Sequence, residues 1–187
     1  MTLLAAQSMT DTLLPRARAG DAEAFATIVR QHQSTVFSIG LRMFNRRDAA
    51  EDLAQDVFLQ LYRKLANIES PEHLGFWLRR VAANLAIDRL RSVAHSHTQP
   101  LAEGDDVAAE EVAADPLRDR ALLSLLGELS PHARAVMLLR YQEDCDIAEI
   151  AAALDMPANT VKSHIKRSLT TLRRRLVGAQ IVDCEEP

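Results

Sequence analysis

The sequence contains few of the residues on which β-sheet proteins depend. Aromatic residues make up 4% of its 187 positions, glycine and proline occur 6 and 7 times, and no run alternates valine, isoleucine, threonine or tyrosine with polar residues. These shortages argue against sandwiches and barrels, which need β-branched and aromatic strands between tight turns. Hydrophobic residues still make up 48% of the chain, enough to build the core of one compact domain or two small ones. We therefore expect an all-α fold.

Cysteines, long hydrophobic runs and cofactor motifs are also scarce. The 2 cysteines, Cys145 and Cys184, form no C-x-x-C pair, and the longest uninterrupted apolar stretches are five residues long. A membrane-spanning helix needs about 20 such residues. Zinc motifs of the H-E-x-x-H kind and glycine-rich phosphate-binding loops do not occur. We expect no cofactor, no metal site and no membrane insertion, and the N-terminus lacks a secretory signal, which predicts a cytoplasmic protein.

Charge is distributed unevenly along the chain. The formal net charge is −4, and residues 93–117 contain six acidic residues, no lysine or arginine, and few large hydrophobic residues. Such a segment does not bury enough apolar surface to offset the entropy lost on ordering. We interpret it as a flexible acidic linker between two helical domains, which occupy residues 1–92 and 118–187.

Hydrophobic residues in the first half recur at helical spacing and predict a bundle of three to four helices. One helix is capped by Asp21 and runs to about Phe44, a second is capped by Asp48, and a third begins near Pro71. The residues expected to face the core are Leu53, Val57 and Leu61 in the second helix, and Leu74, Leu78, Val81 and Leu85 in the third.

The far side of the second helix carries acidic and amide side chains, Glu51, Asp52, Gln55 and Asp56. This cluster is either a solvated helix surface or a docking face for a basic partner. A carboxylate acid/base site is a poorer interpretation, because the motif contains no histidine or lysine base and no substrate loop. On the third helix, Asn84 is either a simple exposed residue or an amide that pairs with base edges.

The second half contains a helix-turn-helix pattern within a predicted four-helix domain. A short helix begins after Asp146, residues 155–157 form a tight turn, and a basic helix begins at Ala158. Residues 156–182 contain six lysines and arginines and no acid. The outward side chains of the basic helix can donate to phosphates and to base edges in the major groove: Asn159, Thr160, Lys162, Ser163, Lys166 and Arg167.

Three segments together resemble a known family. They are Ala49-Ala-Glu-Asp-Leu-Ala-Gln-Asp-Val-Phe-Leu, the stretch from Phe76-Trp-Leu-Arg-Arg to Asp88-Arg-Leu-Arg, and Leu129-Ser-Pro followed by Ile147-Ala-Glu-Ile-Ala and Asn159-Thr-Val-Lys-Ser. In this order and with the linker between them, they are similar to the extracytoplasmic-function (ECF) group of bacterial RNA polymerase sigma factors. The likeness extends over residues 13–176.

The resemblance implies roles for three groups of residues. The face Glu51, Asp52, Gln55 and Asp56 would dock on the clamp helices of the largest polymerase subunit. The basic helix from Asn159 would read the −35 element as duplex DNA. A third group would capture an extruded base of the −10 element, with Asn84 beside the loop that follows Lys64: Lys64, Asn67, Ile68, Arg80 and Asn84. Family members often carry a basic, glycine-rich loop where this chain has Ile68-Glu-Ser-Pro-Glu-His, which implies an unusual −10 preference.

The function implied by the resemblance is that of a promoter-specificity subunit without catalytic activity. Its partners would be core RNA polymerase, promoter DNA and an anti-sigma factor, which in this family is usually anchored in the membrane. An alternative is a free-standing regulator that uses only the helix-turn-helix. A helical hydrolase acting through Glu51 and Asp52 is the third and weakest interpretation.

Overall fold

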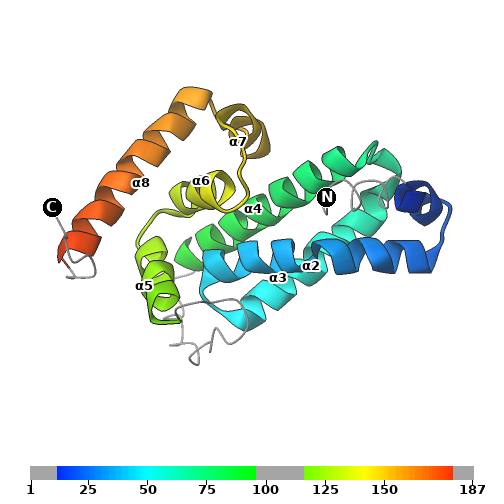
Figure 1. The fold of residues 1–187 in the computed structure, drawn as a ribbon, viewed down its shortest axis with the longest axis horizontal. Coiled ribbons are helices and arrows are strands. Elements are labelled where there is room, and N and C mark those ends of the chain that lie inside the picture. The colour runs from blue at the N-terminus through cyan, green and yellow to red at the C-terminus, as the bar shows by residue number, and fades with distance from the viewer. Residues whose placement is uncertain (1–11, 96–115, 179–187) are drawn as a thin grey trace, which may run out of the picture.

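A computed structural model of the protein describes residues 12–95 and 116–178 (Figure 1). A short helix over residues 12–18 precedes the following elements: α2 (Ala22–Phe44), α3 (Arg47–Lys64), the 3-10 turn η1 (Leu65–Asn67), α4 (Pro71–His95), α5 (Pro116–Gly127), α6 (Pro131–Tyr141), α7 (Ile147–Ala153) and α8 (Ala158–Gly178). Neither described range contains a strand, and the predicted all-α fold is confirmed.

Helical residues occupy both ends of the predicted linker, residues 93–117. Helix α4 extends to His95 and α5 begins at Pro116. Residues 96–115, which make up the rest of the predicted linker, lie outside the described residues, as do residues 1–11 and 179–187.

Helix α2 begins and ends where the sequence predicts. The Asp21 carboxylate accepts hydrogen bonds from the backbone N–H groups of Glu23 and Ala24, at 3.0 and 3.1 Å. These bonds satisfy two of the unpaired donors at the helix N-terminus. Hydrogen bonds from the Ala24 backbone and the Arg16 side chain lower the pKa of Asp21. At the other end, Asn45 adopts a left-handed conformation with φ of 53°, which terminates the helix after Phe44.

The predicted cap of α3 is wrong, although its buried row is correct. The N-cap position is Arg46, which makes no side-chain capping bond. The Asp48 carboxylate instead pairs with the Arg46 guanidinium and accepts from the Ala49 backbone N–H at 2.7 Å. Asp48 is therefore the second residue of the helix, and its carboxylate is held by an ion pair with the N-cap residue Arg46. The predicted core residues of this helix are fully buried, namely Leu53, Val57 and Leu61.

Helices α2 and α3 approach each other closely at a glycine. A Cβ atom added to Gly40 would lie 3.0 Å from the Ala50 Cα and 3.0 Å from Leu53 Cδ2. Both Gly40 and Ala50 are buried. The absence of a side chain at position 40 therefore sets the spacing between the two helices, and it brings the outer face of α3 to a fixed position on the bundle.

Helix α4 has a wider buried face than the predicted row. Leu74 and Leu78 are buried as predicted, but Val81 and Leu85 are only half-buried. The fully covered positions in this part of the helix are Ala82, Ala83, Ala86 and Ile87. The reason is that α4 packs against α2 and α3 on one side and against α6 and α7 on the other (Figure 1). The predicted row of core residues assumed that α4 packs on one side only, whereas the helix is covered on two sides.

The second half forms the predicted helix-turn-helix. The Asp146 side chain accepts from the Glu149 backbone N–H and the Glu149 carboxylate accepts from the Asp146 N–H, so a complete capping box begins α7. Asp155 adopts a left-handed conformation with φ of 49° in the turn before α8. Val161 and Leu172 anchor α8 in the core, while Ile165 and Leu169 pack at its edge.

Helix α6 joins the two halves. Its residues from Ala133 to Leu139 are all buried, because it packs on α2 and α4 as well as on α7 and α8. A helix that is covered on all sides lies at the centre of a fold. The buried hydrophobic residues of both halves form one continuous cluster.

His32 should make the stability of this fold sensitive to mildly acidic pH. Burial, together with the positive charge of Arg79, lowers the pKa of His32 below 6.5. Below about pH 6.5, His32 is protonated in the unfolded chain but stays neutral in the folded chain. The free energy of unfolding therefore falls as pH decreases below about 6.5. Each such group contributes at most about 1.4 kcal/mol per pH unit. Chemical denaturation at several pH values should show a flatter profile for His32→Gln. An unchanged profile would contradict this assignment.

Candidate functional site

The predicted acidic face of α3 is exposed, but two of its four side chains already have partners. Glu51 accepts from Arg47 Nε at 2.9 Å, and Asp56 pairs with Arg89 Nη2 of α4 at 2.5 Å. Asp52 and Gln55 are exposed, and within the described residues their side chains make no hydrogen bond or ion pair. Asp52 is therefore the carboxylate most available to an external cation.

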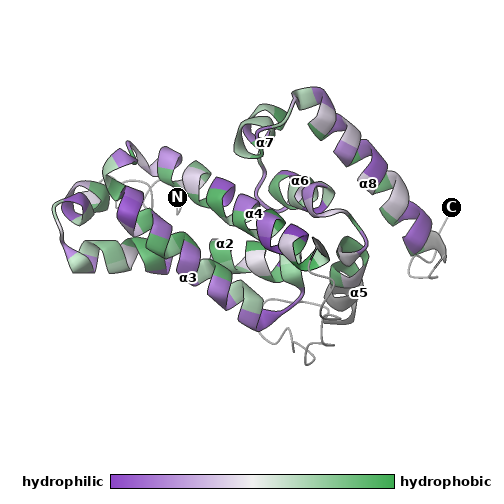
Figure 2. Cartoon of the chain, turned by 180° about the vertical axis from the view of Figure 1, so that it is seen from behind, coloured by the Kyte–Doolittle hydropathy of each residue, from purple (hydrophilic) through white to green (hydrophobic). Residues whose placement is uncertain are grey.

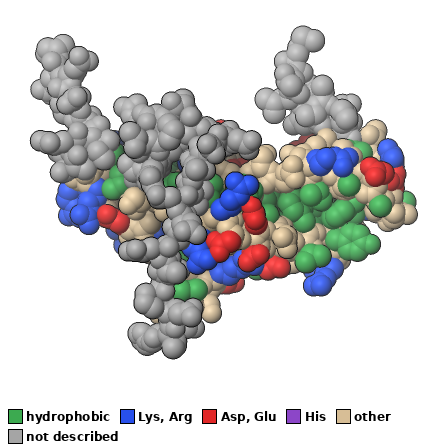
Figure 3. Space-filling model, turned by 90° about the horizontal axis from the view of Figure 1, so that it is seen from below, with side chains coloured by type: hydrophobic (Ala, Val, Ile, Leu, Met, Phe, Trp, Pro, Cys, Tyr) green, Lys and Arg blue, Asp and Glu red, His purple; other side chains and the backbone are tan. Residues whose placement is uncertain are grey.

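An apolar extension of this face was missed by the sequence analysis. Leu59 and Tyr62 lie one and two helical turns beyond Gln55 and have exposed fractions of 55% and 66%. The Tyr62 ring meets the edge of Phe25 from α2, with ring centroids 5.3 Å apart. Figure 3 shows hydrophobic side chains gathered on the underside of the molecule, with charged ones around them. Positions 55, 59 and 62 are spaced four and three residues apart, and this spacing places Leu59 and Tyr62 on the same helix face as Gln55.

The predicted −10 residues separate into exposed and buried groups. Lys64, Asn67 and Arg80 are exposed. Ile68 is a correction, because its side chain is 1% exposed and packs in the core after η1. Burial of a large aliphatic side chain stabilises the turn between α3 and α4 and removes that side chain from any contact with a base.

Asn84 also differs from its predicted placement. It lies 13 residues into α4, about 20 Å along the helix axis from the turn at residues 67–70, and not beside that loop. Its side-chain amide donates to the Arg80 carbonyl at 2.8 Å and to the Ala153 carbonyl at 2.8 Å. The amide predicted to pair with a base edge is thus bound to the end of α7.

The basic face of α8 is open, as its sequence pattern predicts. Asn159, Lys162, Lys166 and Arg167 are exposed, while Thr160 and Ser163 are half-buried. Ser163 Oγ donates to the Asn159 carbonyl, and Arg167 Nε donates to the Ser163 carbonyl. Within the described residues, neither lysine ammonium group has a hydrogen-bond or ion-pair partner. Figure 2 shows hydrophilic residues along α8.

Not all cations of α8 are available. Arg175 Nε pairs with Glu128 Oε2 at 2.8 Å, which ties the last turn of α8 to the segment between α5 and α6. Arg173 and Arg174 are exposed. The cationic surface of α8 is therefore strongest over its first three turns, directly behind the helix-turn-helix turn.

Other chemistry finds no support in the parts of the chain that the structure describes. There, no group of three or more His, Cys, Asp or Glu residues could hold a metal ion, and no helix has the length and hydrophobicity of a membrane span. Cys145 is buried, and desolvation raises the pKa of its thiol, which disfavours the reactive thiolate.

Comparisons with known proteins show which family the chain belongs to. The family model of Sigma-70 region 2 matches residues 28–110, and that of Sigma-70 region 4 matches residues 119–172. The chain is 34% identical to RNA polymerase sigma-E factor of Streptomyces coelicolor, over 87% of this chain and 91% of the relative. It is 28% identical to the ECF sigma factor SigW of Bacillus subtilis, over 91% and 98%. It spans only 43% of the sigma factor RfaY of Xanthomonas campestris, at 33% identity.

The chain belongs to the ECF subfamily of sigma-70 RNA polymerase sigma factors. Solved structures show the same fold. CnrH, in complex with the cytosolic domain of CnrY, has a TM-score of 0.68 at 21% identity and covers 91% of this chain and 98% of its own. RpoE of Bartonella quintana, in complex with the anti-sigma factor NepR, has a TM-score of 0.69 at 21% identity, over 83% and 98%. Membership in this family favours the role of a promoter-specificity subunit over that of a free-standing regulator.

Proposed function

We propose that the protein is a promoter-specificity subunit that brings core RNA polymerase to promoter DNA in the cytoplasm and has no catalytic activity of its own. The observation that carries the proposal is the presence of two open, chemically opposite helix faces. Asp52 and Gln55 are exposed and unpaired on α3, whereas Lys162 and Lys166 are exposed and unpaired on α8. One face suits a basic protein surface and the other suits a polyanion.

The docking surface for polymerase combines charge with apolar area. Asp52 and Gln55 supply polar contacts, and Leu59 and Tyr62 supply exposed hydrophobic surface on the same helix. A few residues supply most of the binding energy at protein interfaces, and tyrosine is enriched among them, so Tyr62 is the side chain expected to contribute most. A partner cation can also displace Arg89 from Asp56, because this pair is partly exposed.

DNA contact is assigned to two separate regions. The face of α8 from Asn159 to Arg167 reads duplex DNA of the −35 element, with lysine and arginine donors directed at phosphates and guanine edges. Lys64, Asn67 and Arg80 serve the −10 element, together with Asn84 once its amide is released from α7. Ile68 has no part in this contact.

An anti-sigma factor is the further partner that we propose for this chain. Its support is the likeness to RpoE, whose solved structure contains the anti-sigma factor NepR. The exposed face of α3 would be covered in such a complex, so the same surface would exclude polymerase.

Transcription with purified components tests the whole proposal. Core polymerase supplied with this protein should initiate at a subset of a promoter library, and core polymerase alone should not. If no promoter in a saturating library supports initiation, the proposed function is wrong.

Reversing the charge of Asp52 tests the docking surface. Asp52→Arg should weaken capture of core polymerase at least about tenfold, because a cation would then face the basic partner. Asp88→Arg is the matched control, since Asp88 is exposed on α4 and the charge change is identical. Binding can be measured by biolayer interferometry with immobilised core enzyme. Equal affinities for the two variants would contradict the placement of polymerase on α3.

A further inference from the structure

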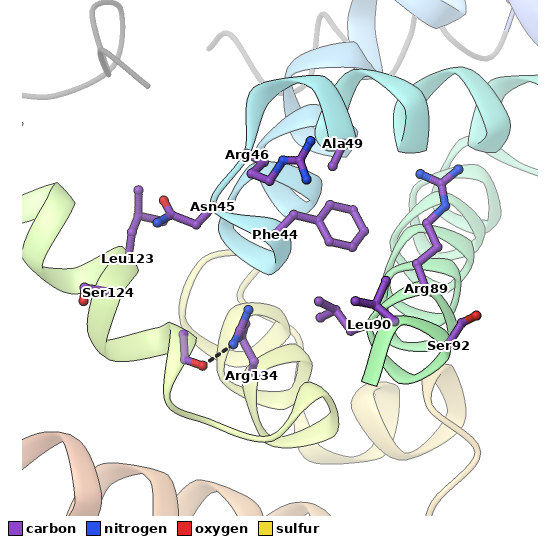
Figure 4. Close-up of a pocket in the computed structure, with 12 residues that line it drawn as sticks. Phe44, Asn45, Arg46, Ala49, Arg89, Leu90, Ser92, Leu123, Ser124 and Arg134 are labelled. Atoms are coloured by element: carbon purple, nitrogen blue, oxygen red, sulfur yellow. Dashed lines mark hydrogen bonds between the residues drawn. The ribbon is translucent and has the colours of Figure 1, made fainter. Parts of the chain in front are cut away.

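A cleft of about 580 Å³ lies between α5 and the last turns of α4 (Figure 4). The turn between α2 and α3 and the side chain of Arg134 from α6 complete its walls. Its volume falls within the roughly 300–1,000 Å³ that is typical of small-molecule sites. The residues proposed to contact polymerase and DNA do not line it.

The inside of the cleft is largely apolar. Phe44 at the end of α2, Leu90 of α4 and Leu123 of α5 are half-buried and line it from three elements (Figure 4). Val93, which also lines it, has an exposed fraction of 46%. Hydrophobic side chains that remain partly in contact with water are stabilised when an apolar group covers them. The cleft therefore favours a ligand with an apolar body.

Every charged side chain that lines the cleft is cationic. Arg46 comes from the turn between α2 and α3, Arg89 from α4 and Arg134 from α6. Among the described residues that line it, none is an aspartate or a glutamate. Guanidinium groups at the wall of an apolar pocket match the geometry of carboxylate and phosphate oxygens. The charge of the cleft therefore selects an anion.

Arg134 carries the least compensated of these charges. The residue is 8% exposed, and its guanidinium donates to the main-chain carbonyls of Met43, Gly127 and Leu129. Within the described part of the chain no carboxylate pairs with it, and its Nε is buried without a hydrogen-bond partner. Burial lowers the pKa of Arg134, because the charged form loses contact with water. A buried charge is costly unless it is paired, so a nearby anion would be favoured.

The other two arginines are in ion pairs that leave donors free. Arg46 pairs with Asp48, and Arg89 Nη2 pairs with Asp56 at 2.5 Å. The side chains of these two aspartates are 63% and 52% exposed, and ion pairs of this kind contribute little to stability. A guanidinium group has about five N–H donors. A ligand oxygen can therefore be bound without breaking either pair.

We infer that this cleft binds a small amphipathic anion, a carboxylic acid or a phosphate monoester with an apolar chain or ring. The guanidinium groups that line the cleft hold the anionic head by charged hydrogen bonds. The half-buried hydrophobic side chains cover the apolar part of the ligand. This inference goes beyond the proposed function and does not depend on it, because the site needs neither polymerase nor DNA.

Isothermal titration calorimetry of the free protein with matched probes tests the site. Octanoate and octyl phosphate carry the same kind of alkyl chain on different anionic heads, octanamide has the chain without the charge, and acetate has the charge without the chain. At least one of the two amphipathic anions should bind with a Kd below about 1 mM. Octanamide and acetate should bind at least about tenfold more weakly, because each lacks one of the two contacts.

The comparison of the two anions identifies the preferred head group. Tighter binding of octanoate assigns the cleft to carboxylic acids, and tighter binding of octyl phosphate assigns it to phosphate monoesters. If neither anion binds, or if octanamide binds as tightly as both, the proposed site is wrong.

Substitutions on α5 place the binding within the cleft. Leu123→Asp sets a carboxylate against the anion and should weaken binding of the tighter probe at least about tenfold. Leu122→Asp is the matched control, because Leu122 is the preceding residue, is 39% exposed and does not line the cleft. Equal affinities for these two variants would overturn the proposal.

A second pair of variants decides the matter if Leu123→Asp does not fold. Arg89→Gln removes a charged donor from the cleft and should also weaken binding about tenfold. Arg63→Gln makes the same change at an exposed position of α3 that does not line the cleft, and it should leave the affinity unchanged. Equal affinities for the two arginine variants would show that the anion binds elsewhere. These measurements omit polymerase and promoter, so their failure would leave the proposed function intact.

Discussion

Replacing Lys162 and Lys166 together with alanine should weaken binding of the polymerase-bound protein to a promoter fragment by about a hundredfold or more. Both side chains are exposed on the face of α8 proposed to enter the major groove. Each charged hydrogen bond is worth about 1.5–3 kcal/mol. Two lost phosphate contacts should also flatten the plot of log K against log salt concentration by about 2, because each contact contributes close to −0.9 to the slope.

Fluorescence anisotropy over about 50 to 200 mM salt measures both quantities. The matched control is Arg18→Ala with Arg63→Ala, which removes the same charge from exposed positions in the first half. The control should leave the slope unchanged. A double lysine variant with the parental slope would show that α8 makes no phosphate contact through these residues.

Replacing Gly40 with alanine should lower the free energy of unfolding by about 1–3 kcal/mol. The added Cβ would meet the Ala50 backbone at 3.0 Å, and a backbone atom cannot rotate away. Gly75→Ala supplies a control with the opposite sign, because a Cβ there meets only the end of Arg79, at 3.8 Å. Removing a glycine from a helix interior without a clash stabilises it by up to about 1 kcal/mol.

Urea denaturation of the two variants gives the comparison directly. The two midpoints should move in opposite directions from that of the parent. If both glycine variants stabilise the protein, the close approach of α2 and α3 would not be a constraint, and the position of the acidic face would have to depend on other contacts.

Local signals in the sequence were sufficient to predict most elements. Asp21 caps α2, and the capping box after Asp146 begins α7, because a cap acts within three residues of its own position. The row Leu53, Val57 and Leu61 is buried because this side of α3 packs on the neighbouring helices α2 and α4. Where a helix has a single environment, periodicity identifies its buried side.

The failures have physical reasons that lie beyond local sequence. Asp48 does not cap α3 because Arg46, two positions earlier, competes for its carboxylate. Ile68 appeared to belong to a polar loop, yet the turn at η1 directs it into the core. Val81 and Leu85 lie only half-buried because α4 has neighbours on two sides.

Contacts between distant residues could not be predicted from one sequence. Arg134 and Met43 are separated by 91 positions, and Asn84 and Ala153 by 69. No spacing rule connects such pairs, and an arginine or asparagine on a helix surface resembles any other polar residue. The charge of α8 was predictable because it is continuous in the sequence, whereas contacts between the two halves are assembled only by folding.

Two hydrogen bonds between the halves of the protein end on main-chain oxygens: Arg134 of α6 donates to the Met43 carbonyl, and Asn84 of α4 donates to the Ala153 carbonyl. Every amino acid carries such an oxygen, so mutational drift at the accepting positions cannot delete it. The strength of the contact between the halves can therefore evolve through the donors Arg134 and Asn84, which lie in different halves. A hybrid protein made by exchanging halves between two sigma factors would inherit one donor from each parent, and the contact between its halves would match that of neither parent.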